Sequence, residues 1–475
     1  MESIIDILNK KPKNQIVIAK GWVKTFRGSR FISLNDGSIN TNLQCVIDPD
    51  NFEKKLIDKI STGCSMMIEG SLVESIGKGQ KVEIIVKKIK IYGECDPEQY
   101  PIQPKKHSFE FLREKAHLRI RTSTFASVMR IRSVANYAIH EFFRKENFFC
   151  VHTPIITGSD AEGAGQMFKV TTKKFQDYLL KNKSRNAHSK DFFGKETFLT
   201  VSGQLEAETY AMGLGKVYTF GPTFRAENSN TTRHLAEFWM IEPEMAFFDL
   251  KDNMDLSEKF IKYILGFIYN NCQIDLNFLN ERLINEEKSL PQNKRSELDL
   301  LERINFVIST KFKRISYSEA HEILKKSNMN KKKKFDYIID NWGTDLQSEH
   351  ERYLVEKYFR CPVIIYDYPS IIKAFYMKQN NDKKTVKAMD ILFPGIGEII
   401  GGSQREEDFN KLLQKIKEMK IDKKELWWYL DLRKFGTVPH SGFGLGFERL
   451  IQFSTGMKNI RDVIPYPRTP QNASF

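Results

Sequence analysis

Between residues 15 and 92, apolar and polar positions alternate with the period of two that half-buried β-strands show. Turn signals such as Asp36-Gly37 separate the apolar runs. The pattern predicts a helical stretch near residues 52–60 and five strands, at residues 16–26, 30–36, 43–48, 65–73 and 82–93. Five short strands and one helix suit a small Greek-key barrel of the OB type, although a five-stranded barrel with another role has the same pattern.

The amino-acid composition and the pattern of apolar positions change near residue 97. Residues 95–106 contain three prolines and few apolar positions, which is typical of a linker. We therefore expect residues 1–97 to form the barrel domain and residues 98–115 to connect it to the rest of the chain. From residue 124 to residue 147, apolar positions recur with the helical period of 3.6.

Residues 116–475 are predicted to form an α+β domain, with an antiparallel sheet flanked by helices. Long helical patterns alternate there with apolar runs typical of strands. These runs lie at residues 197–203, 216–224, 237–248, 363–369, 388–393 and 398–404. Residues 252–351 are helical in pattern, charged and rich in Asn and Lys, which indicates an insertion that decorates the sheet.

Charge and cysteine content bear on which ligands and which cellular compartment the protein is expected to have. Lys and Arg number 74 against 60 Asp and Glu, so the net charge is +14. An excess of this kind favours encounters with polyanions, but Lys331–Lys334 has the composition of a solvated face, and charge alone leaves nucleic-acid binding open. The six cysteines form no C-x-x-C pair, so neither a zinc site nor a disulfide framework is indicated. With no signal peptide or long apolar run recognised, we expect a cytoplasmic protein without a membrane span.

The familiar phosphate-binding and nucleophile motifs are absent from the sequence. There is no G-x-x-x-x-G-K-[ST] loop, no G-x-G-x-x-G after a strand and no G-x-S-x-G elbow. An enzyme that used ATP with this sequence would need another design. Three other clusters carry candidate chemistry.

The first cluster is a predicted hairpin, whose strands flank the polar loop at residues 227–234. Alternation places Arg225 and Glu227 on one face, and it also places Glu242 and Glu244 on one face. An arginine directed into a site binds phosphate through two N–H groups, which lysine does not do. Cross-strand ion pairing on a solvated face is the alternative interpretation.

The second cluster contains two carboxylates on adjacent predicted strands. Asp390 and Glu398 would repel each other across a cavity unless a cation lay between them, and oxygen ligands suit Mg²⁺ carried on nucleotide phosphates. Gly401 and Gly402 permit close backbone approach, and Arg405 offers donors to a small ligand. A simple turn at the glycines and a strand-end cap at Asp390 remain the alternatives.

The third cluster lies at a predicted strand-to-helix junction near residue 446. Gly442, Gly444 and Gly446 alternate, which would leave one strand face bare for a flat ligand or for another backbone. The helix that follows places Arg449 near its positive N-terminal end, where a phosphate group is favoured.

Together these residues resemble the class II aminoacyl-tRNA synthetases, and in particular the aspartyl/asparaginyl subgroup. Residues 148–160 resemble the first motif of that family, FRAE with AEFWMIEPE resembles the second, and GLGFER resembles the third. The resemblance extends over essentially the whole chain. It implies an anticodon-binding barrel, tRNA as a partner, and a homodimer with Pro154 at its interface.

The resemblance also implies roles for individual residues. Amino-acid activation needs no protein nucleophile, because the substrate carboxylate itself attacks the α-phosphate of ATP, and Mg²⁺ accompanies the nucleotide. The implied nucleotide contacts are Arg225 on the α-phosphate, Arg449 on the γ-phosphate, Phe238 on the adenine, and Glu227 and His234 as positioning groups. Asp390 and Glu398 would hold the metal ion, and Glu398, Arg225 and Arg449 would be the catalytic groups. The implied amino-acid contacts are Glu162, Gln204, Glu242 and Arg405.

Two positions favour asparagine over aspartate as the substrate. Aspartyl members of the family read S-P-Q-L-[YF]-K-Q where this chain has SGQLEAE at residues 202–208, so Ala207 replaces a lysine that would neutralise a β-carboxylate. Glu242 replaces a shorter aspartate, and we expect it to accept a hydrogen bond from the asparagine amide. Alternatively, Glu242 only orients Arg405.

Three other functions remain open at this point. An aspartyl enzyme, including one that charges both tRNAs, would share the fold, but Ala207 argues against it. A synthetase-like asparagine synthetase would not need the barrel. A non-catalytic tRNA-binding relative should have lost one of Arg225, Asp390, Glu398 or Arg449, and all four are present.

In the barrel, the resemblance assigns anticodon contacts to Phe31, Gln44 and Glu83. A base stacked on an aromatic ring contributes about 1–3 kcal/mol. Strand alternation places Phe31 on the opposite face from Ile32 and Leu34, which predicts an exposed ring, although a strand phenylalanine often belongs to the core.

Overall fold

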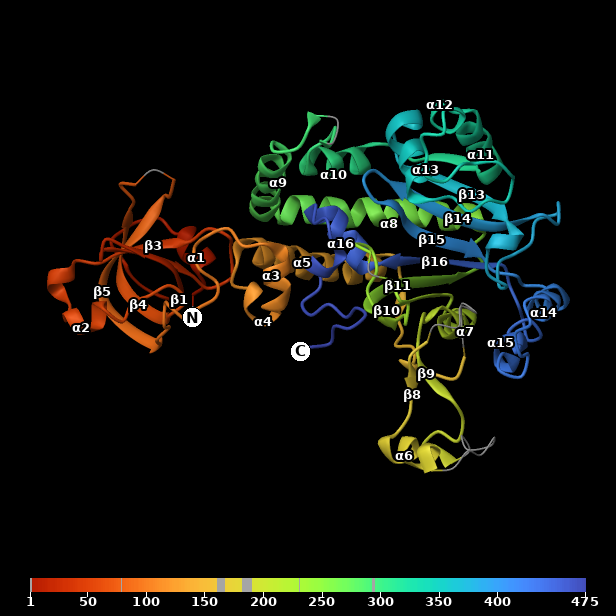
Figure 1. Ribbon diagram of the computed structural model, residues 1–475, viewed down its shortest axis with the longest axis horizontal. Helices are drawn as coiled ribbons and strands as arrows, with labels where there is room; N and C mark the ends of the chain where they lie inside the picture. The colour runs from red at the N-terminus through yellow and green to blue at the C-terminus, as the bar shows by residue number, and fades with distance from the viewer. Residues whose placement is uncertain (1, 78, 160–166, 182–189, 230, 293–294) are drawn as a thin grey trace. The chain divides into compact units, whose positions relative to one another are not determined.

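The computed structural model describes residues 2–77, 79–159, 167–181, 190–229, 231–292 and 295–475. These residues divide into two compact units (Figure 1). The first unit comprises residues 1–131, 272–282 and 475, and the second comprises residues 132–271 and 283–474.

The first unit contains a closed barrel of five strands in the order β1-β2-β3-β5-β4. The strands are β1 (Ile16–Arg27), β2 (Phe31–Asn35), β3 (Leu43–Val46), β4 (Ser65–Glu74) and β5 (Val82–Gly93). The short helix α2 (Lys54–Ile57) lies between β3 and β4 in the sequence. All five predicted strands are confirmed. Their alternating pattern arises because every second residue, such as Val17, Ala19, Ile32 and Leu34, is buried in the barrel core.

Further short helices complete this unit. They are α1 (Ile4–Leu8), η1 (Pro49–Asn51), α3 (Phe109–Glu114) and α4 (Ala116–Arg119). Residues 98–115, predicted to be a linker, therefore include a capped helix, in which Ser108 accepts the Phe111 N–H and Leu112 is buried. Arg130 of α5 (Ser123–Lys145) makes an ion pair of 2.6 Å with Asp275 of α9 (Gln273–Glu287).

The second unit is built on a sheet of eight strands in the order β12-β13-β14-β15-β16-β11-β10-β6. The strands are β6 (Phe149–Cys150), β10 (Lys216–Phe224), β11 (Glu237–Ala246), β12 (Lys313–Ser316), β13 (Val363–Pro369), β14 (Thr385–Phe393), β15 (Gly397–Gln404) and β16 (His440–Gly446). The interior pairs are antiparallel, as predicted, whereas the two edge pairs, β12–β13 and β10–β6, are parallel. The edge strands β6 and β12 have two and four residues, too few to produce a clear alternation in the sequence.

Two long helices supply much of the core of this unit. The helix α8 (Leu250–Asn271) packs against β14, β15 and β16, and its Phe260 lies 4.9 Å from Phe143 of α5 between ring centroids. Residues 252–351, predicted to be an insertion, therefore include a core helix as well as the edge strand β12. An apolar helical stripe is buried whether it belongs to a core helix or to an added one, so the sequence pattern does not separate these cases.

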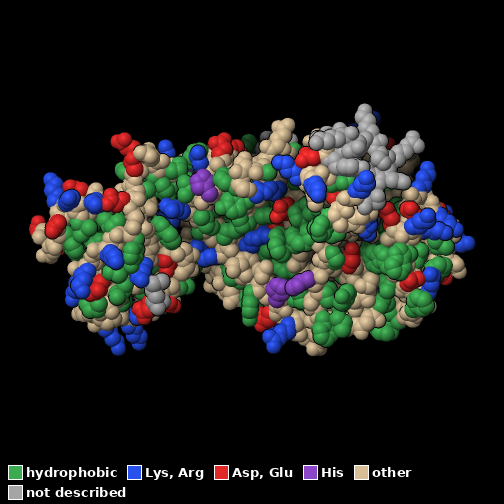
Figure 2. Space-filling model, turned by 90° about the horizontal axis from the view of Figure 1, so that it is seen from below, with side chains coloured by type: hydrophobic (Ala, Val, Ile, Leu, Met, Phe, Trp, Pro, Cys, Tyr) green, Lys and Arg blue, Asp and Glu red, His purple; other side chains and the backbone are tan. Residues whose placement is uncertain are grey.

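The remaining elements surround this sheet. They are β7 (Ile156–Thr157), β8 (Lys169–Val170), α6 (Lys173–Lys181), β9 (Thr197–Leu199), α7 (Gln204–Leu214), α10 (Leu300–Ser309), α11 (Tyr317–Lys326), α12 (Asn328–Lys331), α13 (Ser348–Arg352), η4 (Tyr353–Phe359), η5 (Ser370–Ile372), α14 (Phe409–Glu418), α15 (Trp427–Asp431), α16 (Phe447–Thr455) and η6 (Ile460–Asp462). None of the helices in the described ranges is long and apolar enough to cross a membrane. On the face drawn in Figure 2, basic and acidic side chains are interspersed.

Candidate active site

The predicted hairpin forms, and it places an arginine beside an aromatic ring. β10 and β11 pair from Lys216↔Met245 to Phe224↔Glu237, and the Arg225 N–H then donates to the carbonyl oxygen of Ala236 at 3.0 Å. The Arg225 guanidinium carbon lies 5.4 Å from the centroid of the Phe238 ring. A cation and an aromatic face at one end of a hairpin suit a ligand that combines a phosphate with a flat base.

The loop at the tip of this hairpin brings two predicted residues together. His234 Nε2 lies 3.7 Å from Glu227 Oε2. The other ring nitrogen, Nδ1, lies 3.1 Å from Ser229 Oγ and 2.5 Å from Thr231 Oγ1. The loop therefore holds the imidazole with its Nε2 side directed to a carboxylate.

The two predicted metal ligands converge on one glycine. A Cβ atom on Gly401 would lie 3.2 Å from Glu398 Oε1 and 3.4 Å from Asp390 Oδ1, so a side chain there would fill the space between the carboxylates. Arg449 donates from Nη1 to the Glu398 carbonyl oxygen at 3.2 Å, and the same atom lies 3.9 Å from Glu398 Oε2. The structure therefore brings Asp390, Glu398 and Arg449 together around one site.

A third carboxylate, which the sequence analysis missed, supports this pair. Glu351 Oε2 accepts the Glu398 N–H at 2.9 Å. Burial raises the pKa of Glu351 to about 8, and the negative charges of Glu398 and Asp390 add to the shift. Burial and the charge of Asp390 also raise the pKa of Glu398, against the opposing charges of Arg449, Lys373 and Arg225.

Lys373 is a further residue that the sequence analysis did not single out. Its Nζ lies 2.8 Å from Asp390 Oδ2 and 3.9 Å from the centroid of the Tyr368 ring. Burial lowers the pKa of Lys373, but the hydrogen bond to Asp390 and the charges of Asp390, Glu398 and Asp345 together outweigh this effect and raise it. No group of three or more His, Cys, Asp and Glu residues is arranged to hold a metal ion within the described part of the chain. Two carboxylates such as Asp390 and Glu398 would fill only part of the coordination shell of a hard cation, so a cation there would need further oxygen ligands.

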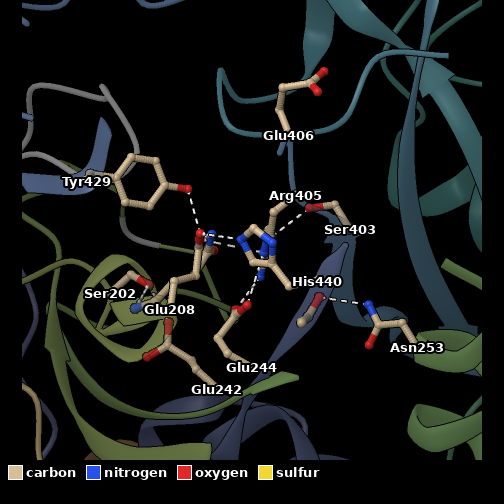
Figure 3. Close-up of polar contacts among 12 residues, drawn as sticks. Ser202, Glu208, Glu242, Glu244, Asn253, Ser403, Arg405, Glu406, Tyr429 and His440 are labelled. Atoms are coloured by element: carbon tan, nitrogen blue, oxygen red, sulfur yellow. Dashed lines mark hydrogen bonds and ion pairs between the residues drawn. The ribbon is translucent and has the colours of Figure 1, made fainter. Parts of the chain in front are cut away.

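Arg405, which follows β15, lies in a buried cluster of charged side chains, here called the Arg405 pocket (Figure 3). Only 2% of the residue is exposed. Its Nε donates to Glu244 Oε2 at 3.2 Å, its Nη2 donates to Glu244 Oε1, and its Nη1 donates to Ser403 Oγ at 2.6 Å. Burial raises the pKa of Glu244, while the charge of Arg405 and the hydrogen bonds from its guanidinium oppose this shift and favour the carboxylate form.

A second buried carboxylate, Glu208 of α7, shares this pocket. Its Oε1 lies 3.7 Å from Arg405 Nε. Its Oε2 accepts from the Tyr429 hydroxyl at 2.7 Å and from Arg433 Nη2 at 3.1 Å, and it lies 3.1 Å from His440 Nε2 (Figure 3). Burial raises the pKa of Glu208, but the His440 contact and the charge of Arg433 outweigh it and hold this pKa well below its usual range.

The predicted residue Gln204 also contacts this carboxylate. Gln204 Nε2 donates to Glu208 Oε1 at 3.0 Å, one helical turn along α7. Residues four apart lie on the same face of a helix, so the position of Glu208 four residues after Gln204 was the one sign in the sequence that Glu208 faces the pocket. Nothing local in the sequence indicated Arg433 or His440.

Glu242 accepts hydrogen bonds from Ser202 and Gly203 rather than from Arg405. The Ser202 hydroxyl donates to Oε1, and the Gly203 N–H donates to Oε2 at 3.0 Å. The residue that orients Arg405 is Glu244, two positions further along β11. Burial raises the pKa of Glu242, while the charges of Arg225 and Arg405 both lower it, so Glu242 lies where the hairpin site and the Arg405 pocket adjoin.

The predicted bare face of the glycine-rich strand is filled at two positions. A Cβ on Gly442 would lie 2.2 Å from Glu244 Oε1, and one on Gly444 would lie 2.9 Å from Met240 Cε. The expectation of a surface for a flat ligand is wrong there, because the neighbouring strand β11 directs its own side chains over the glycines. Ala207, at the position of the family's lysine, is buried with Ala211 and Val217.

In the barrel, the three predicted residues lie on neighbouring strands. Phe31 is 43% exposed, which confirms the orientation that alternation predicts. Gln44 Nε2 donates to Glu83 Oε2 at 3.1 Å, and Ser75 Oγ donates to the same oxygen at 2.8 Å. Glu162, predicted near the amino-acid ammonium group, lies outside the described residues.

Comparisons with known proteins show the family of this chain. A family model of class II tRNA synthetases (D, K and N) matches residues 108–470, and one of an OB-fold nucleic acid binding domain matches residues 17–92. An asparagine–tRNA ligase of Cytophaga hutchinsonii is 56% identical over 465 residues, which cover 97% of this chain and 96% of the relative. One of Bacteroides fragilis is 55% identical over 475 residues, with 99% and 98% covered.

A solved structure is also similar over the full length. The asparaginyl-tRNA synthetase from Pyrococcus horikoshii, complexed with asparaginyl-adenylate, has a TM-score of 0.83 and 32% sequence identity, with 99% of each chain covered.

Proposed function

The chain belongs to the class II tRNA synthetases, and from this premise we propose that it is an asparagine–tRNA ligase. In the first step, the carboxylate of asparagine attacks the α-phosphate of ATP, which forms asparaginyl-adenylate and releases diphosphate. In the second step, the terminal adenosine hydroxyl of tRNA takes the asparaginyl group. The observation that carries this proposal is the adjacency of three sites on one sheet: the Arg225–Phe238 pair, the carboxylates on either side of Gly401, and the Arg405 pocket.

For the nucleotide, we assign the adenine to the Phe238 ring and the α-phosphate to Arg225. The guanidinium carbon and the ring centroid lie 5.4 Å apart at one end of the hairpin, which supports this because one nucleotide can contact both groups. Glu227 and His234, held 3.7 Å apart at the tip of the hairpin, would position the nucleotide from the loop. Arg449, near the start of α16, would bind the γ-phosphate, where the helix N-terminus adds positive potential.

For the metal, we assign Mg²⁺ to Asp390 and Glu398, with ATP phosphates as the other ligands. Both carboxylates face the space that Gly401 leaves open. Mg²⁺ bound there would offset negative charge on the phosphates as the α-phosphate is attacked. Arg225 would stabilise the same developing charge from the hairpin side.

For the amino acid, we assign the side chain to Arg405 and Glu242, with Gln204 beside them and Glu162 near the ammonium group. An ionised carboxylate has about four acceptor sites. The two hydrogen bonds from Ser202 and Gly203 therefore leave Glu242 able to accept from the amide NH₂ of asparagine. A β-carboxylate in the same place would be repelled, and Ala207 supplies no compensating charge.

The barrel, taken as residues 1–97, would bind the anticodon through Phe31, Gln44 and Glu83. Its exposed ring and its neighbouring amide and carboxylate offer stacking and hydrogen bonding on one face. The linker at 98–115 would join it to the catalytic domain at 116–475.

We also propose a homodimer in the cytoplasm. The segment around Pro154 exposes three apolar residues, with Phe149, Ile155 and Ile156 at 55%, 44% and 40%. The six free cysteines suit a reducing compartment.

The test is diphosphate exchange into ATP with purified protein, Mg²⁺ and either asparagine or aspartate, without tRNA. Exchange with asparagine alone is the expected result. Exchange with aspartate alone would replace the proposal by an aspartyl enzyme of the same fold. Absence of exchange with either amino acid would favour a non-catalytic tRNA-binding role.

A further inference from the structure

The Arg405 pocket contains more negative charge than is needed to hold one arginine. Glu244 already satisfies the Arg405 guanidinium through two hydrogen bonds. Glu208 nevertheless lies 3.7 Å from the same guanidinium, and both carboxylates are fully buried. Glu208 also pairs with Arg433 at 3.1 Å, so its buried charge is balanced by one arginine and still acts on the other.

Counted over the whole cluster, the charges leave no excess of positive charge. Two buried arginines, Arg405 and Arg433, stand among the buried carboxylates Glu208, Glu242 and Glu244, and a further buried carboxylate, Glu406, lies nearby (Figure 3). His440 has one nitrogen 3.1 Å from Glu208 Oε2 and the other 2.9 Å from the Val438 carbonyl oxygen.

We propose that Glu208 is a positioning residue that selects asparagine over aspartate by cancelling positive charge at Arg405. The inference rests on the proposed function and adds to it a residue that makes no substrate contact in that proposal. With Glu208 ionised, the β-carboxylate of aspartate would enter the Arg405 pocket as an unbalanced negative charge. The neutral amide of asparagine pays no such penalty.

The pocket still offers hydrogen bonds to a neutral ligand. Arginine has five N–H groups, and in Arg405 three of them donate to Glu244 and Ser403. Two N–H groups are thus available for the oxygen of an amide. Charge cancellation by Glu208 therefore removes long-range attraction for a carboxylate while it leaves the short-range donors in place.

Glu208 is also fixed in place, so its charge acts from one position. Its Oε1 accepts from Gln204, and its Oε2 accepts from Tyr429 and Arg433. A carboxylate with three such donors has no free rotation and stays ionised. Its effect on Arg405 is then electrostatic and does not depend on motion.

The experiment compares E208Q with wild type in the exchange assay. The measured quantities are KM for asparagine and the inhibition constant Ki of aspartate as a competitor. For E208Q we expect Ki for aspartate to fall by about tenfold or more, because a charge at this separation in a buried cluster contributes at least that factor. KM for asparagine should stay the same or rise. Y429F is the matched control, since it removes one hydrogen bond to Glu208 and keeps the charge; its ratio of Ki to KM should stay within about twofold of wild type.

A double variant separates charge from structure. E208Q/R433Q removes one negative and one positive charge together, so the ratio of Ki to KM should return to within about threefold of wild type, although more hydrogen bonds are lost. Because KM and Ki do not depend on the fraction of active protein, partial unfolding does not alter the ratio. If E208Q yields no folded protein, R433Q alone provides the test, and its Ki for aspartate should rise.

Two results would overturn the inference. One is an unchanged ratio in E208Q, with both constants weakened equally, as a purely structural role requires. The other is a double variant that accepts aspartate as well as E208Q does. If wild type fails to exchange with asparagine, the proposed function fails instead, and the two failures are thereby distinguished.

Discussion

The Nζ of Lys373 lies 2.8 Å from Oδ2 of Asp390, so an ammonium group pairs with one of the two carboxylates assigned to the metal. The side chains are only 17% and 13% exposed. Asp390, Glu398 and Glu351 place three carboxylates close together, and Lys373 offsets part of their charge together with Arg449 and Arg225.

Replacing Lys373 should therefore make the protein depend more on magnesium. In K373M the charge of Asp390 is left buried and unpaired, which should lower the free energy of unfolding by about 3–5 kcal/mol without ligands. Mg²⁺ with ATP should restore more thermal stability to K373M than it adds to wild type, as thermal unfolding with and without the nucleotide will show. K251M is the control, because the Lys251–Asp255 pair is 72% and 48% exposed and should contribute less than about 1 kcal/mol. Equal stabilisation of both proteins by Mg²⁺ and ATP would contradict this role.

The buried Glu351 should make the ligand-free protein less stable as pH rises. Its folded pKa, about 8, lies above the ordinary glutamate value of 4.5, so the folded state retains a proton that the unfolded state releases. This contribution is fully present below about pH 4.5 and is lost progressively as pH rises to about 8. E351Q cannot ionise, yet its amide oxygen can still accept the Glu398 N–H. The melting temperature of E351Q minus that of wild type should therefore increase by several degrees, about 5, between about pH 5.5 and about pH 8.5. A difference independent of pH would show that Glu351 does not titrate in this range.

A methyl group at Gly442 should disable the amino-acid pocket. The Cβ of G442A would lie 2.2 Å from Glu244 Oε1, closer than real contacts allow, so Glu244 must shift and its contacts with Arg405 weaken. Asparagine-dependent exchange should fall by at least about tenfold, with a loss of stability of about 1–3 kcal/mol. G213A in α7 is the control, because nothing lies within 4 Å of its Cβ, and it should retain full exchange. Normal activity of G442A would show that the Glu244–Arg405 geometry is not required.

Loss of the Phe31 ring should weaken tRNA binding and leave amino-acid activation intact. F31A removes a half-exposed ring, so stability should change little, while tRNA affinity should fall by about 1–3 kcal/mol if a base stacks there. Binding of tRNA and exchange without tRNA are measured side by side. I76A, at a residue 98% exposed on the barrel, should change neither. An unchanged affinity in F31A would remove this residue from the anticodon site.

Local sequence patterns were sufficient to predict most of the helices and strands. Strand alternation predicted all five barrel strands and the exposed side of Phe31, and the helical period predicted α5. These signals depend on residues two to four positions apart, which the chain itself places on one face. The same reasoning failed for the strand of Gly442 and Gly444, because the space beside a glycine is decided by the neighbouring strand.

Only some residues of the site could be predicted from the sequence, because others reach the site through elements distant in the chain. Family motifs led to Arg225, Asp390, Glu398, Arg405 and Arg449, and the structure places these around adjoining sites. Lys373, Glu351 and Glu208 were missed, and each acts on a partner far along the chain: Asp390, Glu398 and Arg405.

By itself, then, the sequence determined the elements, the barrel and the family, because backbone period, turn chemistry and motif order are local properties. Only the tertiary structure decided how the buried charges are balanced. Strand order and helix packing across many residues bring Glu208 to Arg405 and Lys373 to Asp390. An unpaired buried ion would destabilise the fold, so these pairings decide which charges the site can contain.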